Sequence, residues 1–221
     1  STWLDDLSRE RLVSGNLEEI ISTKSIVGVT TNPAIFAAAM TNGTAYDAEL
    51  STLKETKASA DEAVYALAIE DVKNACDLFA DIYSSTNGAD GRVSIEVDPR
   101  ISDDANATLE QARELWSKVD RPNVMIKIPA TTGSLPAIED ALAEGISVNV
   151  TLIFSVDRYR DVIEAFRTGL KRAAEAGKDV STIHSVASFF VSRLDTEVDK
   201  RLEAIGSEIA PVSYTHLRAH E

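Results

Sequence analysis

One lysine lies where lysine is rarely found, in the middle of an apolar run. Lys127 stands between Ile126 and Ile128, inside the segment 124–130. Lysine is disfavoured inside strands and is almost never fully buried without a partner or a task. If the run is a buried strand, loss of water favours the neutral amine, which can attack a carbonyl carbon. The alternative is a lysine that reaches solvent at a strand end or pairs with a carboxylate, and this strand alone leaves both open.

Two carboxylates end other β-rich runs in a comparable way. Glu96 ends the run that begins at Arg92, and Asp5 ends the run at the start of the chain. Either residue alone would more often be a helix cap or a surface charge. Three inward-pointing ionisable groups on three strands are costly to bury together without a function. We therefore expect Lys127, Glu96 and Asp5 to share one site.

The elements that would hold these residues alternate between strand and helix. Between the apolar runs lie segments with apolar residues three and four positions apart, which predicts helices, two of them opened by Ser102–Asp104 and by Ser155. The gap of about 60 residues after the second run is expected to hold two or three helices, including a long one from about Asp61 to Tyr83. The predicted strands are Thr2–Asp5, Ile26–Thr31, Arg92–Val97, Asn123–Ile128, Ile146–Thr151 and Ile183–Ser188.

The alternation of side chains along the strands favours a barrel over a doubly wound open sheet. In the third, fourth and fifth runs, aliphatic residues take one face of each strand. The other face carries Ser94 and Glu96, then Met125 and Lys127, then Ser147, Asn149 and Thr151. Strands of an open parallel sheet are covered on both sides and usually read as continuously apolar. Polar groups that converge inside a ring of strands are typical of a TIM barrel.

The overall composition limits the classes of partner. The chain has 221 residues, with 36 acidic against 22 basic side chains and a net charge of −14. Such a surface repels nucleic acid and anionic membranes. No apolar stretch approaches the roughly 18 to 20 residues of a membrane helix. A single cysteine, Cys76, suits a reducing compartment, so we expect a cytoplasmic protein.

Five short motifs on successive predicted strands resemble those of transaldolase, most closely the bacterial branch of that family. They occur in the family's order, and the similarity spans residues 1 to about 205. Each is weak alone, but five in register are a specific signal. The motifs are Trp3-Leu4-Asp5-Asp6-Leu7, Val29-Thr30-Thr31-Asn32-Pro33, Ser94-Ile95-Glu96-Val97-Asp98, Ile126-Lys127-Ile128-Pro129-Ala130-Thr131 and Asn149-Val150-Thr151-Leu152-Ile153-Phe154-Ser155.

The resemblance implies a class I aldol transfer on a (β/α)8-type barrel. Lys127 matches the family's Schiff-base lysine, and Glu96 matches the carboxylate that moves protons through an ordered water. Thr151 matches the hydroxyl that holds this water. Asp5, chosen over Asp6 because it directly follows the apolar strand residues, matches the acid/base for the C4 hydroxyl. No metal or other cofactor is implied.

The same resemblance implies a set of substrate contacts. The amides that hold the dihydroxyacetone unit match Asn32 and Asn149, and a phosphate-binding position matches Arg193, in a motif altered from the family pattern at Phe189 and Ser192. The implied substrates are sedoheptulose 7-phosphate, fructose 6-phosphate, glyceraldehyde 3-phosphate and erythrose 4-phosphate. The complete set of implied substrate-binding residues is Thr30, Asn32, Asn149, Ser188, Phe190 and Arg193.

The end of the chain departs from the family. We predict one partial barrel domain over residues 1–207, with about six of eight strands, and an atypical tail over residues 208–221. Two alternatives follow: an aldolase that releases free dihydroxyacetone, and an inactive fragment that keeps the site residues. His216 and His220 have a helical metal-ligand spacing but no third ligand nearby, so no metal site is expected. His184 is expected on the inner face of the sixth strand, without an assigned role, and the oligomeric state stays open.

Overall fold

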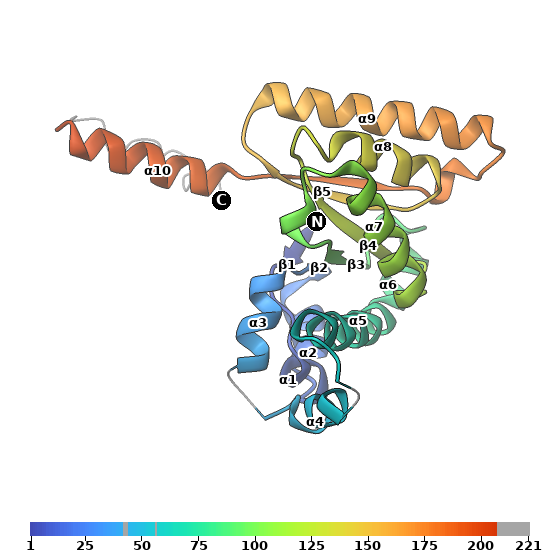
Figure 1. Cartoon of the computed structure of the whole chain (residues 1–221), viewed down its shortest axis with the longest axis vertical. Coiled ribbons are helices and arrows are strands. Elements are labelled where there is room, and N and C mark those ends of the chain that lie inside the picture. The colour runs from blue at the N-terminus through green and yellow to red at the C-terminus, as the bar shows by residue number, and fades with distance from the viewer. Residues whose placement is uncertain (42–43, 56, 207–221) are drawn as a thin grey trace.

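Six parallel strands form a single curled sheet, with helices on its outer face (Figure 1). The computed structural model describes residues 1–41, 44–55 and 57–206 of the chain. Each strand pairs with its neighbours in sequence, in the order β1-β2-β3-β4-β5-β6. The strands are β1 (Thr2–Leu4), β2 (Ile26–Thr30), β3 (Arg92–Glu96), β4 (Val124–Pro129), β5 (Val148–Ile153) and β6 (Ser185–Phe189). The fold is therefore α/β, an incomplete TIM-type barrel, as the sequence predicted.

The helices follow the strands, with an insertion after β2. The α-helices are α1 (Arg9–Val13), α2 (Asn16–Lys24), α3 (Pro33–Thr41), α4 (Asp47–Glu55), α5 (Ala60–Leu78), α6 (Ala80–Ser85), α7 (Ala105–Val119), α8 (Leu135–Ala143), α9 (Val156–Glu175) and α10 (Val191–Ala204). Two 3-10 turns, η1 (Pro99–Ile101) and η2 (Val180–Thr182), complete the described elements. The described residues between β2 and β3 form four helices, α3 to α6, rather than the two or three that the sequence predicted.

The long helix predicted from Asp61 to Tyr83 is wrong in one respect, since it breaks at Phe79. This residue ends α5 and begins α6, with φ −91° and ψ 1°. Its N–H donates to the Ala75 carbonyl and its carbonyl accepts from Tyr83, so both helices keep a hydrogen bond there. The Phe79 side chain is fully buried. Burial of the ring in the core therefore fixes the bend where periodicity alone continued the helix.

Two strands, β5 and β6, begin two residues later than predicted because a local turn takes the N–H group of the first predicted residue. The Ile146 N–H donates to Ala141 at the end of α8, and the Ile183 N–H donates to Val180 in η2. Neither residue can then join the ladder at once. Strand β5 consequently runs Val148–Ile153, and β6 begins at Ser185.

The hydrophobic core lies between the sheet and its helices, on the face that the alternation predicted. The aliphatic side chains of β4, such as Ile126 and Ile128, are fully buried in one cluster with apolar residues of α7 and α8. Helices α8 and α9 also approach closely, because a Cβ on Gly169 would lie 2.7 Å from the Glu139 carbonyl oxygen. Each fully buried aliphatic side chain contributes about 1.5–3 kcal/mol. This packing leaves the opposite face of the strands free for the polar residues.

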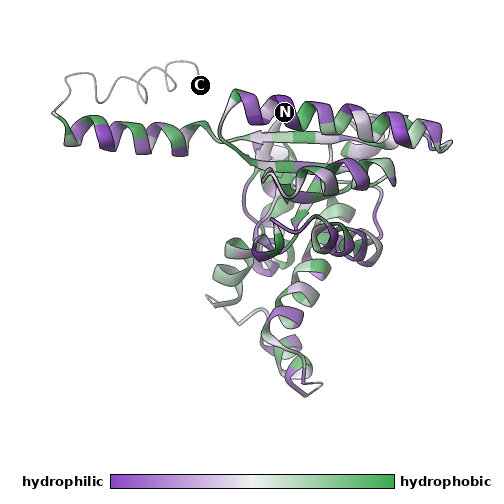
Figure 2. Ribbon diagram, turned by 45° about the horizontal axis from the view of Figure 1, so that its top comes forward, coloured by the Kyte–Doolittle hydropathy of each residue, from purple (hydrophilic) through white to green (hydrophobic). Residues whose placement is uncertain are grey.

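The last described elements are packed much less tightly. Helix α10 extends away from the rest of the molecule and shows both polar and apolar positions along its length (Figure 2). None of its residues is buried, and apolar side chains such as Leu194 and Val198 are exposed. No helix among the described residues is long and apolar enough to cross a membrane. The predicted boundary at residue 207 and the tail 208–221, with His216 and His220, lie outside the described residues.

Candidate active site

Lys127 is buried inside the curled sheet and is held by two oxygen atoms. Its side chain is 6% exposed, and Nζ donates a 2.9 Å hydrogen bond to the main-chain oxygen of Thr31. The carboxylate oxygen Oε2 of Glu96 lies 3.1 Å from the same nitrogen. Glu96 and Lys127 are also direct partners in the β3–β4 register. The lysine therefore does not reach solvent; it belongs to a buried pair.

The environment of Glu96 keeps its carboxyl group ready to bind a proton. Burial raises the pKa of Glu96, and the nearby Lys127 opposes that shift. Two residues from other segments act on it more weakly: Asp5 raises the pKa and Arg193 lowers it. A carboxyl with a raised pKa beside an amine can accept the amine's proton and later return it. The pair can therefore supply both a nucleophile and an acid/base.

An amide and two hydroxyl groups continue this polar row towards β6. Asn149 is the register partner of Lys127 on β5, and its Nδ2 donates to the Ser94 hydroxyl at 3.1 Å. The Ser188 hydroxyl donates to Asn149 Oδ1 at 2.9 Å. The structure thus brings two of the predicted substrate residues, Asn149 and Ser188, into direct contact. Their mutual hydrogen bonds orient the amide before any ligand arrives.

Two predicted threonine hydroxyls are buried but make no hydrogen bond to the described residues. They are Oγ1 of Thr30 on β2 and Oγ1 of Thr151 on β5. Buried hydroxyl groups are rarely left without a partner, because the loss of water costs free energy. Both groups are therefore able to bind a water molecule or a substrate hydroxyl.

Asp5 and Asp6 differ in their surroundings. Asp6 accepts a 2.8 Å hydrogen bond from Arg11 Nε, so its carboxylate is engaged in an ion pair. Asp5 is exposed immediately after β1, and it lies close enough to raise the pKa of Glu96. Asp5 thus lies just outside the strand in which the sequence placed it, and its role at the site stays a prediction.

The remaining predicted residues lie at the rim of the site or have a structural contact. Asn32 caps α3, since its Oδ1 accepts from the Ile35 N–H at 3.0 Å, and this bond does not use its amide nitrogen. Phe190 packs against Phe154, with ring centroids 5.5 Å apart. The Arg193 guanidinium lies 4.6 Å from the centre of the Phe190 ring and is exposed. His184 precedes β6 and is half-buried; burial and the nearby Arg92 lower its pKa.

Sequence reasoning missed two residues that hold the site together. Thr31 accepts the hydrogen bond from Lys127 with its carbonyl and donates its own hydroxyl to the Ser94 carbonyl at 2.7 Å. Its place beside Asn32 in the second motif was an available signal. Tyr65, on α5, donates to the Glu96 carbonyl at 3.3 Å. Nothing in its local sequence separates it from an ordinary core residue.

The fold and the site together define a class: a β/α-barrel chain with a buried lysine–carboxylate pair, suited to Schiff-base chemistry on a carbonyl compound. No group of three or more His, Cys, Asp or Glu side chains that could hold a metal ion occurs in the described part of the chain. The family model for transaldolase/fructose-6-phosphate aldolase matches residues 2–219. The chain belongs to this family.

Several curated relatives carry the name transaldolase. The transaldolase of Mycolicibacterium smegmatis is 61% identical over 210 residues, covering 95% of this chain and 57% of the relative. That of Kocuria rhizophila is 60% identical with the same two coverages. That of Mycobacterium ulcerans is 61% identical over 207 residues, covering 94% of this chain and 56% of the relative. The chain thus spans a little over half the length of the relatives it matches.

Proposed function

We propose that this chain carries the catalytic centre of a transaldolase, which moves a dihydroxyacetone unit from a ketose phosphate to an aldose phosphate. The observation that carries the proposal is the buried Lys127–Glu96 pair, with Nζ and Oε2 3.1 Å apart. Family membership and relatives named transaldolase at about 60% identity support it. We also infer a cytoplasmic location, from the single buried cysteine, Cys76.

The first half of the proposed reaction forms the imine. Glu96 takes a proton from Lys127, and the neutral amine attacks the C2 carbonyl of fructose 6-phosphate or sedoheptulose 7-phosphate. Glu96 then gives a proton to the carbinolamine hydroxyl through a water held by Thr151, and that hydroxyl leaves as water. The product is a protonated imine at Lys127, which accepts an electron pair without a metal ion.

The second half breaks the carbon–carbon bond. Asp5 takes the proton from the C4 hydroxyl, the C3–C4 bond breaks, and its electrons move to the imine to give an enamine. Glyceraldehyde 3-phosphate or erythrose 4-phosphate leaves, according to the donor. Asn32, Asn149 and Ser188 hold the three-carbon enamine until a second aldose phosphate accepts it.

The substrate phosphate is assigned to the rim of the site. Arg193 supplies the cation there, and its guanidinium stacks over the Phe190 ring. Thr30 adds a hydroxyl group on the inner face of β2. Transfer is preferred over an aldolase that releases dihydroxyacetone because the carboxylate Glu96, rather than a tyrosine, contacts the lysine amine.

Borohydride trapping tests this proposal directly. The chain is incubated with fructose 6-phosphate and reduced, and peptides are mapped for the added mass, with Lys127→Arg as the control. We expect label on Lys127 in the unchanged chain and none in the variant. A folded, cooperatively unfolding chain without label at Lys127 would contradict the proposal and favour an inactive fragment. Free dihydroxyacetone released without an acceptor would favour the aldolase instead.

A further inference from the structure

The end of β3 extends beyond its main-chain hydrogen bonds to β2. There the Tyr65 side chain binds it instead. The described β2–β3 pairing ends at Thr30 and Ser94, two residues before Glu96. Beyond that point hydroxyl groups supply the missing donors. Thr31 Oγ1 donates to the Ser94 carbonyl at 2.7 Å, and the Tyr65 hydroxyl donates to the Glu96 carbonyl at 3.3 Å. Tyr65 thus binds the peptide group of the residue whose carboxylate faces Lys127.

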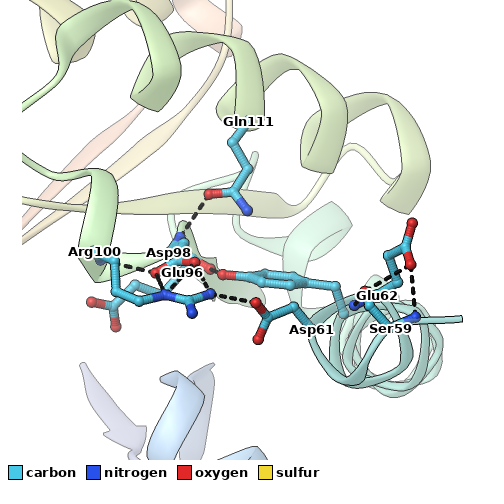
Figure 3. Close-up of polar contacts among 8 residues, drawn as sticks. Ser59, Asp61, Glu62, Glu96, Asp98, Arg100 and Gln111 are labelled. Atoms are coloured by element: carbon cyan, nitrogen blue, oxygen red, sulfur yellow. Dashed lines mark hydrogen bonds and ion pairs between the residues drawn. The ribbon is translucent and has the colours of Figure 1, made fainter.

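A second group of contacts fixes Asp98, two residues after Glu96 (Figure 3). The Asp98 N–H donates to Gln111 Oε1 on α7 at 2.7 Å. Arg100 Nε donates to the Asp98 carboxylate at 2.9 Å, and Arg100 Nη2 lies 2.7 Å from the Asp61 carboxylate. The segment that carries Glu96 is therefore anchored from behind by α5 and α7.

Tyr65 also lies beside two spaces. One is a groove of about 480 Å³ between α5 and α7, lined in part by Lys73, Gln111 and Lys118. The other is a cavity of about 20 Å³ lined by Asn32, Phe36, Ile95 and Glu96. Tyr65 lines both spaces.

The hydroxyl of Tyr65 stays protonated over the whole working range of pH. Burial raises the pKa of Tyr65 far above its ordinary value, and the carboxylates of Asp98 and Glu96 raise it further. Gln111 and Arg100 oppose the shift, but burial is the largest cause. A hydroxyl that does not ionise is a constant donor to the Glu96 carbonyl.

We propose that Tyr65 is a positioning residue for proton transfer: its hydrogen bond to the Glu96 carbonyl fixes the peptide plane that aims the Glu96 carboxylate at Lys127. The inference rests on the proposed function for the importance of that carboxylate. The orientation of the carboxylate matters because proton transfer requires heavy-atom distances of about 2.6–3.2 Å. A displacement of about 1 Å can change a rate by up to about 100-fold.

The charged groups around Glu96 determine how the pKa of its carboxyl changes when the Tyr65 hydrogen bond is removed. Lys127 on β4 lowers its pKa, Arg193 on α10 lowers it further, and Asp5 after β1 raises it. Behind Tyr65 lie the paired charges Asp98 and Arg100. Removal of the Tyr65 hydroxyl keeps the ring, and so keeps the site dry. Glu96 then loses part of its contact with Lys127, and its pKa rises.

The experiment compares Tyr65→Phe with Tyr46→Phe in the 221-residue chain. Tyr46 is the matched control because its buried hydroxyl donates to Asp71 at 2.6 Å, in a network whose other members are Arg9 and Glu49. Three quantities are measured. They are the rate of borohydride trapping with saturating fructose 6-phosphate across pH, the KM for fructose 6-phosphate in the same assay, and the titration of the Glu96 carboxyl by NMR of ¹³C-glutamate, assigned with Glu96→Gln. We expect Tyr65→Phe to slow trapping about tenfold, with a near-unchanged KM, and to move both midpoints to higher pH. Tyr46→Phe should lower stability but change neither midpoint.

Unchanged trapping and an unchanged Glu96 titration in Tyr65→Phe overturn the inference. An equal loss in both variants also overturns it, because that result marks a general loss of stability. If the unchanged chain gives no label on Lys127, the proposed function fails, and the Glu96 titration still tests whether Tyr65 holds this strand end. Should Tyr65→Phe not fold, Gln111→Leu frees the same segment at Asp98, and the same two shifts are expected.

Discussion

The two halves of the candidate site are built in different ways. Strands β3 and β4 are buried along their whole length, and they hold Glu96 and Lys127 in a direct register pair. At the other half, β6 is only partly buried, and α10 has no buried residue at all. Ser188, Phe190 and Arg193 come from this second half. One half is fixed by a packed core, whereas the other pairs with it through the β5–β6 ladder but is itself little buried.

This contrast separates chemistry from substrate capture. Burial suits the Glu96–Lys127 pair to the proposed chemistry, because it raises the Glu96 pKa and excludes water. A phosphate group needs the reverse, an accessible cation such as Arg193 that can meet a charged ligand from solvent. We therefore expect substitutions in the first half to change the rate of the chemical step, and substitutions in the second half to change affinity.

The largest expected effect is that of Glu96→Gln. The amide keeps the size of the side chain but cannot exchange a proton with Lys127. The rate of imine trapping should fall by about 10²–10⁴-fold at saturating substrate, the usual range for loss of an acid/base. Glu203→Gln, on an exposed position of α10, is the matched control and should keep the original rate. A loss of less than tenfold in Glu96→Gln would remove Glu96 from the mechanism and with it the contrast between the halves.

The two halves should also differ in how much their side chains contribute to the free energy of unfolding. Ile126→Ala in the middle of β4 removes a fully buried side chain from the core, and the free energy of unfolding should fall by about 2–5 kcal/mol. Leu194→Ala on α10 removes a side chain that is 43% exposed, and the change should stay within about 0.5 kcal/mol. Urea unfolding measures both. Equal losses for the two variants would mean that α10 is packed in solution and that the contrast does not hold.

Arg193→Met tests the affinity half more selectively. The variant removes the cation that is proposed to bind the substrate phosphate but keeps an apolar contact with Phe190. We expect the substrate concentration for half-maximal trapping to rise about tenfold, with the maximal rate changed less than about threefold. Arg201→Met is the control, because Arg201 is exposed further along α10 and pairs with Glu197. A tenfold fall in the maximal rate, with affinity unchanged, would place Arg193 in the chemical step instead.

Features that depend on strand alternation could be predicted from the sequence. Lys127 and Glu96 were predicted to share the inner face, and their register pairing follows from two adjacent parallel strands with the same alternation. Asn149 and Ser188 were predicted to belong to one site, but their direct hydrogen bond was not predicted. The roles assigned to Asp5, Thr151 and the other predicted residues are still predictions, as are the domain limits at 207 and 208.

The parts that could not be predicted depend on competition between distant groups. The starts of β5 and β6 moved because Ile146 and Ile183 give their N–H groups to turns. The break at Phe79 arises from burial of one ring among several helices. Tyr65 reaches Glu96 from 31 positions away, through the packing of α5 on β3. No local pattern contains such information, since each case is decided by which partner lies nearby in the folded chain.

The smallest predicted effect is electrostatic: charges outside the buried pair should shift the pKa of Glu96. Arg193 lowers the Glu96 pKa and Asp5 raises it, so their neutral replacements should act in opposite directions. Protonated Glu96 cannot accept the proton of Lys127, and trapping therefore declines as pH falls through the Glu96 pKa.

Arg193→Met removes the cation, raises the Glu96 pKa, and should move the acid limb of the trapping profile to higher pH. Asp5→Asn should move it to lower pH, and trapping can still report this because Asp5 is proposed to act only after the imine has formed. Each shift should shrink in 1 M salt, where the screening length is about 3 Å. Shifts in the same direction, or shifts that survive the salt, would mean that the variants act on Glu96 by moving β3 and not through charge.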